Sequence, residues 1–210
     1  MSRIFLIGNG KSLLDTPLEL LKDEDTMALN AIDLIYDKTD WRPTYYFCMD
    51  VNPNDRHRWA AIESNRNCKK LFLWEKWKEK FPWDNVEWLP LCKKHHPFPV
   101  QSKNALQEWH LPTICSAHGS MSPMMQLAVQ MGYTEIYLVG VDLWTSKKCH
   151  FDENYPAYWV WEERNKIENH IHQVARKSSP VPIYNATLGG NLEVHPRVDL
   201  FKILERKEYV

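Results

Sequence analysis

The first residues whose types and spacing suggest chemistry are Gly8-Asn9-Gly10-Lys11-Ser12, which follow the apolar run "RIFLI". A strand, a glycine turn and a helix start form a cradle in which backbone N–H groups and the helix dipole attract an anion. Gly8 and Gly10 permit close approach of a ligand, and Ser12 can donate to phosphate or cap the helix. The turn is not GxGxxG, because Leu13 occupies the third glycine position, and it is not a Walker A loop. It therefore predicts a phosphate site, and glycine used for turn geometry alone is the alternative.

Two aspartates that end apolar runs are candidates for metal binding. Asp50 ends "PTYYFCMD", and Asp142 ends "EIYLVGVD". Mg²⁺ takes one or two carboxylates together with phosphate oxygens and waters, so Asp50 and Asp142 would hold it if the reaction depends on magnesium. Asp50 can equally contact a ribose or satisfy a solvated turn, and Asp142 can orient the loop that follows it. Mg²⁺ is the one cofactor that these residues leave open.

The histidines offer one candidate for proton transfer. His150 lies in the polar stretch "SKKCHFDEN", where a general acid or base is one interpretation and an exposed titrating side chain is the other. His170 and His172 lie two apart in a helical pattern, which places them on different faces and argues against a paired metal site. We therefore expect His150, together with Asp142, to be the catalytic pair.

Three further positions place polar groups where apolar runs end or helices begin. Asn30 follows the run "TMAL", and Asn185 follows "VPIY" and precedes a turn with two glycines. Gly119 and Ser120 precede the apolar helix pattern "MMQLAVQM", so Ser120 can cap that helix or contact a phosphate. The turn after Asn185 has a structural alternative, because glycine there can serve geometry alone.

These residues can form one site only in a fold that brings the ends of several strands together. The apolar pattern predicts such a fold. We expect a Rossmann-like α/β fold, a mostly parallel sheet with helices on both faces, because strands alternate with helices. In such sheets ligands bind at the carboxyl ends of the strands. The predicted strands are 3–7, 26–31, 43–50, 68–74, 135–143 and 181–186, and the predicted helices are 12–22 with an interruption near Pro17, 120–131, 157–177 and 197–206.

Length and composition indicate a single domain, residues 1–210, with residues 75–113 as an irregular insertion or lid that is rich in Trp, Pro, Lys and His. A formal net charge of -1 does not favour nucleic acid as a partner. The five cysteines include no CxxC pair, which suits a reducing cytoplasm. No apolar stretch approaches the roughly 20 residues of an integral membrane segment. Assembly into a homo-oligomer stays open.

Two sequence blocks resemble known families when they are taken together. "LIGNGKSL" resembles the "GNGPSL" opening of the bacterial lipooligosaccharide sialyltransferases, which use a CMP-sugar donor. The same opening occurs in the related 6-hydroxymethylpterin pyrophosphokinase-like proteins, which include motility-accessory factors. "AHGSMSPMMQLAVQMGYTEIYLVGVDLW", residues 117–144, is similar to a second block that both groups share.

The resemblance implies roles for matching residues. Lys11 replaces the usual proline of the opening turn, and Trp144 stands where the sialyltransferases have an active-site tyrosine. In the pyrophosphokinase-like group, a histidine often follows the aspartate that matches Asp142, and His150 fits it. The remaining matches are nucleotide or donor contacts: Gly8, Asn9, Gly10, Ser12, Asn30, Asp50, Gly119, Ser120 and Asn185.

The function that the resemblance implies is transfer from a nucleotide-activated donor to a small-molecule or glycan acceptor. A CMP-sugar glycosyltransferase of the sialyltransferase type is the first hypothesis. A Mg²⁺-dependent pyrophosphokinase-like transferase that uses ATP is the second. A non-catalytic nucleotide-binding or assembly protein on the same fold is the third.

Overall fold

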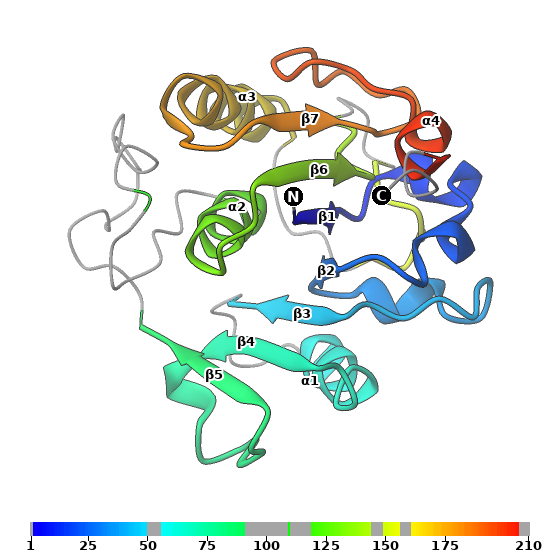
Figure 1. Cartoon of the computed structure of the whole chain (residues 1–210). Coiled ribbons are helices and arrows are strands. Elements are labelled where there is room, and N and C mark those ends of the chain that lie inside the picture. Colours follow the sequence, from blue (N-terminus) through cyan, green and yellow to red (C-terminus); the bar gives the residue numbers. More distant parts are fainter. Residues whose placement is uncertain are drawn as a thin grey trace.

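A parallel sheet forms the centre of the molecule. The computed structural model describes residues 2–49, 56–90, 109, 119–143, 149–155 and 161–205. Within these ranges, seven strands pair in parallel in the order β5-β4-β3-β2-β1-β6-β7 (Figure 1). The predicted Rossmann-like α/β fold is confirmed. The strands are β1 (Arg3–Ile7), β2 (Thr26–Leu29), β3 (Tyr45–Cys48), β4 (Lys70–Trp74), β5 (Val86–Leu89), β6 (Glu135–Val139) and β7 (Ile183–Asn185).

Helices cover both faces of this sheet, which explains why the inner strands are continuous apolar runs. Ile4 and Leu6 of β1 belong to one core, which they share with α2 and α3. Phe5 and Ile7 point the other way into a second core with α1, α4 and the 3-10 helices (Figure 1). The helices are η1 (Lys11–Asp15), η2 (Leu18–Leu21), η3 (Ile32–Ile35), α1 (Arg56–Ser64), η4 (Glu75–Trp77), α2 (Met121–Gln130), α3 (Trp161–Ser178) and α4 (Leu200–Glu205).

The carboxyl end of β1 lies where the strand order reverses. β1 is flanked by β2 and β6, so Ile7 is in register with Ala28 on one side and with Val139 on the other. In open parallel sheets, the connections leave on opposite faces at such a point and open a crevice for a ligand. The turns that follow β1 and β6 are therefore at the edge of the sheet where this architecture binds ligands.

Most of the predicted elements are confirmed, with boundaries that differ by a few residues. The helix expected over 12–22 is divided at Pro17 into η1 and η2, because proline has no N–H to continue a helix. The long helix expected over 157–177 is α3, which is described from Trp161 onward. No helix in the described ranges has the length and apolar composition needed to cross a membrane.

The prediction of an irregular segment over 75–113 is wrong at residues 86–89. Residues 86–89 form β5, which pairs with β4 at the edge of the sheet, and η4 precedes it. A half-exposed edge strand that contains Trp88 and Glu87 lacks the continuous apolar pattern that identified the inner strands. Trp109 is buried in the core beside α2 and α3. The other residues of the expected lid, from 91 to 113, lie outside the described residues.

Candidate functional site

The turn after β1 is fastened directly to the end of β6. Gly8 N donates to Val139 O at 2.7 Å, and Gly10 N donates to Gly140 O at 2.8 Å. A Cβ on Gly8 would lie 2.4 Å from Gly140 O, and one on Gly10 would lie 2.4 Å from the carboxyl carbon of Asp142. Both glycines are thus required by close packing of the two strand ends. Their predicted contact with a ligand stays a prediction.

Asp142 and Ser12 are brought together, and they are partners of one another. The Asp142 carboxylate accepts hydrogen bonds from the backbone N–H of Ser12 at 2.8 Å and from its hydroxyl. Both residues are buried, and the carbonyl of Asp142 also accepts a bond from Asn191 N at 2.6 Å. Ser12 does not cap η1. This geometry gives Asp142 a fastening role between the first turn and the end of β6.

The magnesium hypothesis gains no support from the described residues. Among them, no group of three or more His, Cys, Asp or Glu side chains is placed to hold a metal ion. Asp50, the second carboxylate of that hypothesis, lies outside the described residues. The predicted pairing of Asp50 with Asp142 therefore stays a prediction.

Two buried asparagines form the polar centre of the site. The Asn9 side chain follows β1 and donates from Nδ2 to Leu29 O at 3.0 Å and to the Tyr155 hydroxyl at 2.8 Å. Asn30 follows β2 and donates from Nδ2 to the Ser120 hydroxyl at 3.2 Å, directly before α2. The Oδ1 atoms of both asparagines are buried, and neither accepts a hydrogen bond from any described residue. Buried amide oxygens are ordinarily satisfied, so this pair indicates a missing donor.

The backbone of Asn30 is held in an unusual conformation. Its φ is 51°, in the left-handed region. Asn30 N donates to Phe47 O at 3.1 Å, and the Tyr46 hydroxyl donates to Asn30 O at 2.7 Å. Backbone strain of this kind persists when the surrounding structure fixes it, and it is enriched at functional sites. Here it directs the Asn30 amide toward Ser120. The neighbouring Gly119 lies beside Glu168, whose Oε1 would be 3.0 Å from an added Cβ.

The loop that contains His150 folds back on the first turn, as its predicted role requires. Phe151 N donates to Asn9 O at 3.2 Å, and Lys11 N donates to Cys149 O at 3.1 Å. The His150 ring stacks on the Tyr155 ring with centroids 3.9 Å apart and an interplanar angle of 4°. His150 is thereby placed next to the hydroxyl that Asn9 contacts. A catalytic role for His150 stays a prediction.

Sequence reasoning missed two residues of this centre, Tyr155 and Arg58. Burial raises the pKa of the Tyr155 hydroxyl, while the charge of Arg58 and the hydrogen bond from Asn9 partly offset the rise. The Arg58 guanidinium lies 5.9 Å from the Tyr155 ring centre, and its residue is 4% exposed. No motif marks either residue. The one available signal concerns Arg58: the start of α1 follows β3 and therefore lies at the carboxyl edge of the sheet.

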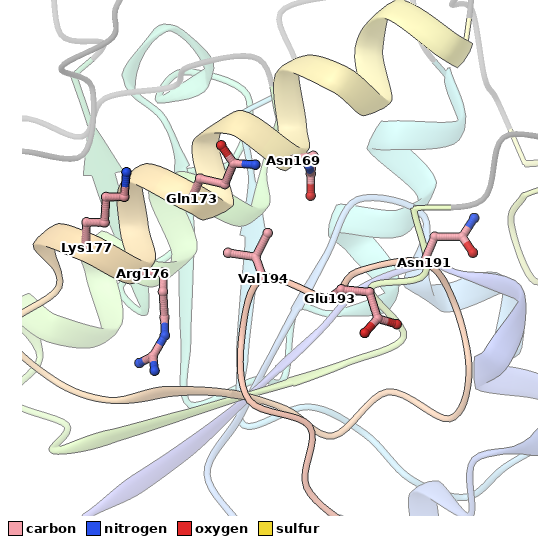
Figure 2. Close-up of a pocket in the computed structure, with 7 residues that line it drawn as sticks. All are labelled: Asn169, Gln173, Arg176, Lys177, Asn191, Glu193 and Val194. Carbon is pink, nitrogen blue, oxygen red and sulfur yellow. The ribbon is translucent and has the colours of Figure 1, made fainter.

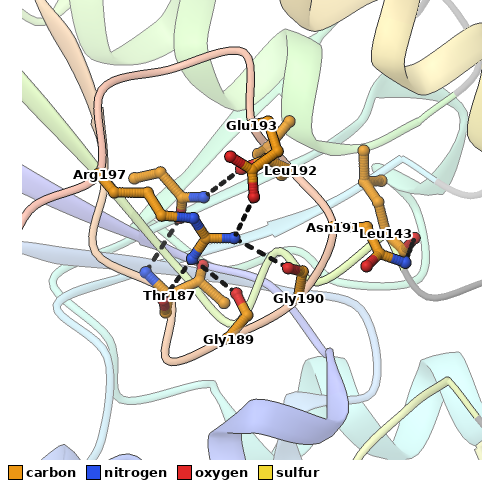
Figure 3. A network of polar contacts seen from close by, with 9 residues as sticks. Leu143, Thr187, Gly189, Gly190, Asn191, Leu192, Glu193 and Arg197 are labelled. Atoms are coloured by element: carbon orange, nitrogen blue, oxygen red, sulfur yellow. Dashed lines mark hydrogen bonds and ion pairs between the residues drawn. The ribbon is translucent and has the colours of Figure 1, made fainter.

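Asn185 serves a different structure, the glycine-containing loop after β7. Its Nδ2 donates to Leu192 O at 2.7 Å, and its Oδ1 accepts from Thr187 N at 3.0 Å. Arg197 closes the same loop by donating to the carbonyls of Thr187, Gly189 and Gly190 (Figure 3). Both ends of the Asn185 amide are engaged within this loop. Its predicted contact with a donor stays a prediction.

A groove of about 450 Å³ lies between α3 and this loop, and it is separate from the polar centre. Figure 2 shows the lining side chains of α3 spaced along the helix and those of the loop beside it. None of the predicted site residues is among its lining residues, which are Asn169, Gln173, Arg176, Lys177, Asn191, Glu193 and Val194. The polar centre and not this groove holds the buried amides, and we place the candidate site there.

A buried histidine pair joins α3 to the loop after β7. His172 Nδ1 and His195 Nε2 are 2.9 Å apart, and both residues are buried. Burial lowers the pKa of His172 to about 3, and His195 adds to this effect. Burial also lowers the pKa of His195 to about 4, with a further contribution from the charge of Arg176. The pair is thus neutral at pH 7.

Comparison by sequence finds no relative. No protein-family model matches the chain. No curated protein matches it either.

Comparison with solved structures finds the same fold in glycosyltransferases. The MAf glycosyltransferase of Magnetospirillum magneticum AMB-1 is similar with a TM-score of 0.63 and 12% identity over 94% of this chain. This chain spans 33% of that protein. The sialyltransferase CstII of Campylobacter jejuni, in complex with cytidine-5'-monophosphate, is similar with a TM-score of 0.57 and 15% identity, over 94% of this chain and 85% of that one.

The monofunctional α-2,3-sialyltransferase Cst-I of Campylobacter jejuni gives a TM-score of 0.59 and 16% identity, over 95% of this chain and 81% of that one. The TM-scores establish a shared fold. The structural similarity that the two sequence blocks predicted, to sialyltransferases and to a motility-accessory-factor glycosyltransferase, is thereby confirmed.

Proposed function

We propose that this protein binds a cytidine-nucleotide sugar at the polar centre around Asn9 and Asn30 and transfers the sugar to an acceptor hydroxyl. The observation that carries the proposal is the pair of buried amide oxygens without a donor. An amide oxygen only accepts hydrogen bonds, so a phosphate oxygen cannot satisfy it. Ribose hydroxyls and the amino group of cytosine can. The shared fold with a sialyltransferase that binds cytidine-5'-monophosphate supports the same class of ligand.

The remaining polar groups suit the phosphate and the reacting end of such a donor. The hydroxyls of Ser120 and Tyr155 are hydrogen-bond donors next to the two amides. In the transfer step, the acceptor oxygen forms a bond to the sugar carbon as the bond from that carbon to the phosphate oxygen breaks. The proton of the acceptor hydroxyl passes to His150, and the donors near the phosphate stabilise its developing charge.

Calorimetric titration tests the donor assignment. We expect CMP to bind without a metal ion, and we expect Asn30→Gly to weaken CMP binding roughly tenfold through loss of at least one hydrogen bond. Glycine accepts the left-handed backbone of position 30, so this variant removes the amide and keeps the turn. Asn169→Ala, on α3, is the control and keeps the wild-type affinity.

Other outcomes of the titration identify other functions. Binding of ATP only in the presence of Mg²⁺ would support pyrophosphoryl transfer instead. Absence of binding to any nucleotide would support a non-catalytic assembly protein. An unchanged CMP affinity in Asn30→Gly would place the nucleotide elsewhere on the molecule.

A second measurement tests His150 as the base. We expect His150→Asn to slow release of CMP from a CMP-sugar, with water or an added acceptor, by about 10²–10⁴-fold, the usual contribution of a general base. CMP affinity should stay near the wild-type value, and the acidic limb of the pH profile should vanish, because the neutral imidazole is the active form. His170→Asn, an exposed residue of α3, is the control. Full turnover in His150→Asn would show that another group takes the proton.

A further inference from the structure

Arg58 places a buried positive charge at the polar centre. The residue lies near the start of α1 and is 4% exposed. A charged side chain is costly to bury, and it is ordinarily found buried only where it is paired or serves a ligand. The groups around the guanidinium therefore indicate whether Arg58 is paired with another residue or serves a ligand.

Arg58 lies beside Tyr155, a residue of the polar centre. The Arg58 guanidinium lies 5.9 Å from the centre of the Tyr155 ring, and the Tyr155 hydroxyl accepts a hydrogen bond from Asn9 Nδ2 at 2.8 Å. The guanidinium is thus beside the tyrosine that contacts Asn9, whose amide oxygen, like that of Asn30, has no donor among the described residues. A ligand that satisfies those amides brings its neighbouring groups within reach of the cation.

The surroundings of Arg58 include a carboxylic acid, Asp33, whose pKa the charge of Arg58 affects. Burial raises the pKa of Asp33 in η3, and the charges of His57 and Arg58 oppose that rise. Asp33 can therefore act as a counter-ion to Arg58. If Arg58 is purely structural, its role is to pair with Asp33. A test of any ligand role must separate the two residues.

We propose that Arg58 binds the anionic group of the ligand, so that the site selects charged nucleotides over the neutral nucleoside. A guanidinium binds phosphate or carboxylate through two parallel N–H donors, which an amide or an ammonium cannot reproduce. The anion is either the nucleotide phosphate or a carboxylate on the transferred sugar. The nucleoside part of this assignment rests on the proposed function, whereas the anion part rests on Arg58 itself.

Titration of matched ligands into matched variants tests the proposal. The ligands are cytidine, CMP, a CMP-sugar with a carboxylate and inorganic pyrophosphate. We expect Arg58→Gln to weaken CMP about 10- to 100-fold, the value of a charged hydrogen bond, and to leave cytidine unchanged. Arg58→Lys should recover part of the loss. Arg66→Gln, an exposed arginine beyond the end of α1, and Asp33→Asn are controls that should keep the preference for CMP.

The pattern of losses separates the sources of the anion. Loss confined to the carboxylate-bearing CMP-sugar would assign Arg58 to the sugar and not to the phosphate. Equal loss for cytidine and CMP in Arg58→Gln, or the same loss in Asp33→Asn, would overturn the proposal and make Arg58 a structural residue.

Two further readouts keep the proposal testable if a variant does not fold or the nucleotide is wrong. In the wild-type protein, added salt should weaken CMP and leave cytidine unchanged, since screening acts on charged contacts. Equal sensitivity of both ligands would count against Arg58. If no cytidine compound binds, the proposed function fails, but pyrophosphate binding that is lost in Arg58→Gln would still uphold the anion site. If pyrophosphate also fails to bind, both the proposed function and the anion site at Arg58 are wrong.

Discussion

Asp142→Ala is expected to lower the free energy of unfolding by about 2–4 kcal/mol, because it leaves the buried N–H and hydroxyl of Ser12 without their acceptor. Each buried polar group that loses its partner costs roughly 1–3 kcal/mol. Urea unfolding followed by circular dichroism measures the loss. Asp84→Ala, at an exposed position, is the control and stays within about 0.5 kcal/mol of the wild type.

A double-mutant cycle distinguishes this fastening role from a role in metal binding. If Asp142 acts through Ser12, the effects of Asp142→Ala and Ser12→Ala are not additive, since both remove one interaction. If Asp142 were a magnesium ligand instead, Asp142→Ala in metal-free buffer would leave the stability unchanged. That result would contradict the role assigned here.

Acid is expected to unfold this protein through His172 and His195. Their folded-state pKa values of about 3 and about 4 lie below the usual 6.5 of an exposed histidine. Between those values the unfolded chain binds protons that the folded chain excludes, so stability falls as the pH drops from about 6.5 toward 4. The slope is about 1.4 kcal/mol per pH unit for each histidine. Chemical unfolding at a series of pH values measures it.

Substitution of each histidine isolates its share of the acid response. His172→Gln should make the dependence of stability on pH less steep by about one proton over this interval, and His170→Gln, at an exposed position, should leave it unchanged. An equally steep dependence in His172→Gln would show that other groups govern acid unfolding.

The sequence predicted those parts of the fold that are buried on both faces. β1 is a continuous apolar run that ends at the turn of Gly8, and β6 is one between Gly132 and Gly140; such runs have few alternatives to a buried strand. β5 was missed because an edge strand is partly exposed and alternates less clearly. α1 was missed for a similar reason: "RHRWAAIES" has no clear apolar stripe to mark a helix.

The site residues at strand ends could be predicted from the sequence, whereas those in irregular loops could not. Asn9 and Asn30 were found because carboxyl ends of parallel strands meet at one edge. The pairing of Ser12 with Asp142 was not predicted, because it depends on the register of two strands that are far apart in sequence. Tyr155 lies in an irregular loop, and its contact with Asn9 leaves no periodic signal.

The central place of β1 has a consequence for how the chain folds. Its neighbour β6 is distant in sequence: Ser2 N bonds to Thr134 Oγ1 across a separation of 132 residues. During synthesis, β1 to β5 emerge first. One edge of β1 therefore stays unpaired until β6 has been synthesised. Contacts of such high sequence separation slow folding, because loop closure must precede the gain from pairing. Until then, the unpaired edge of β1 can pair with another nascent chain.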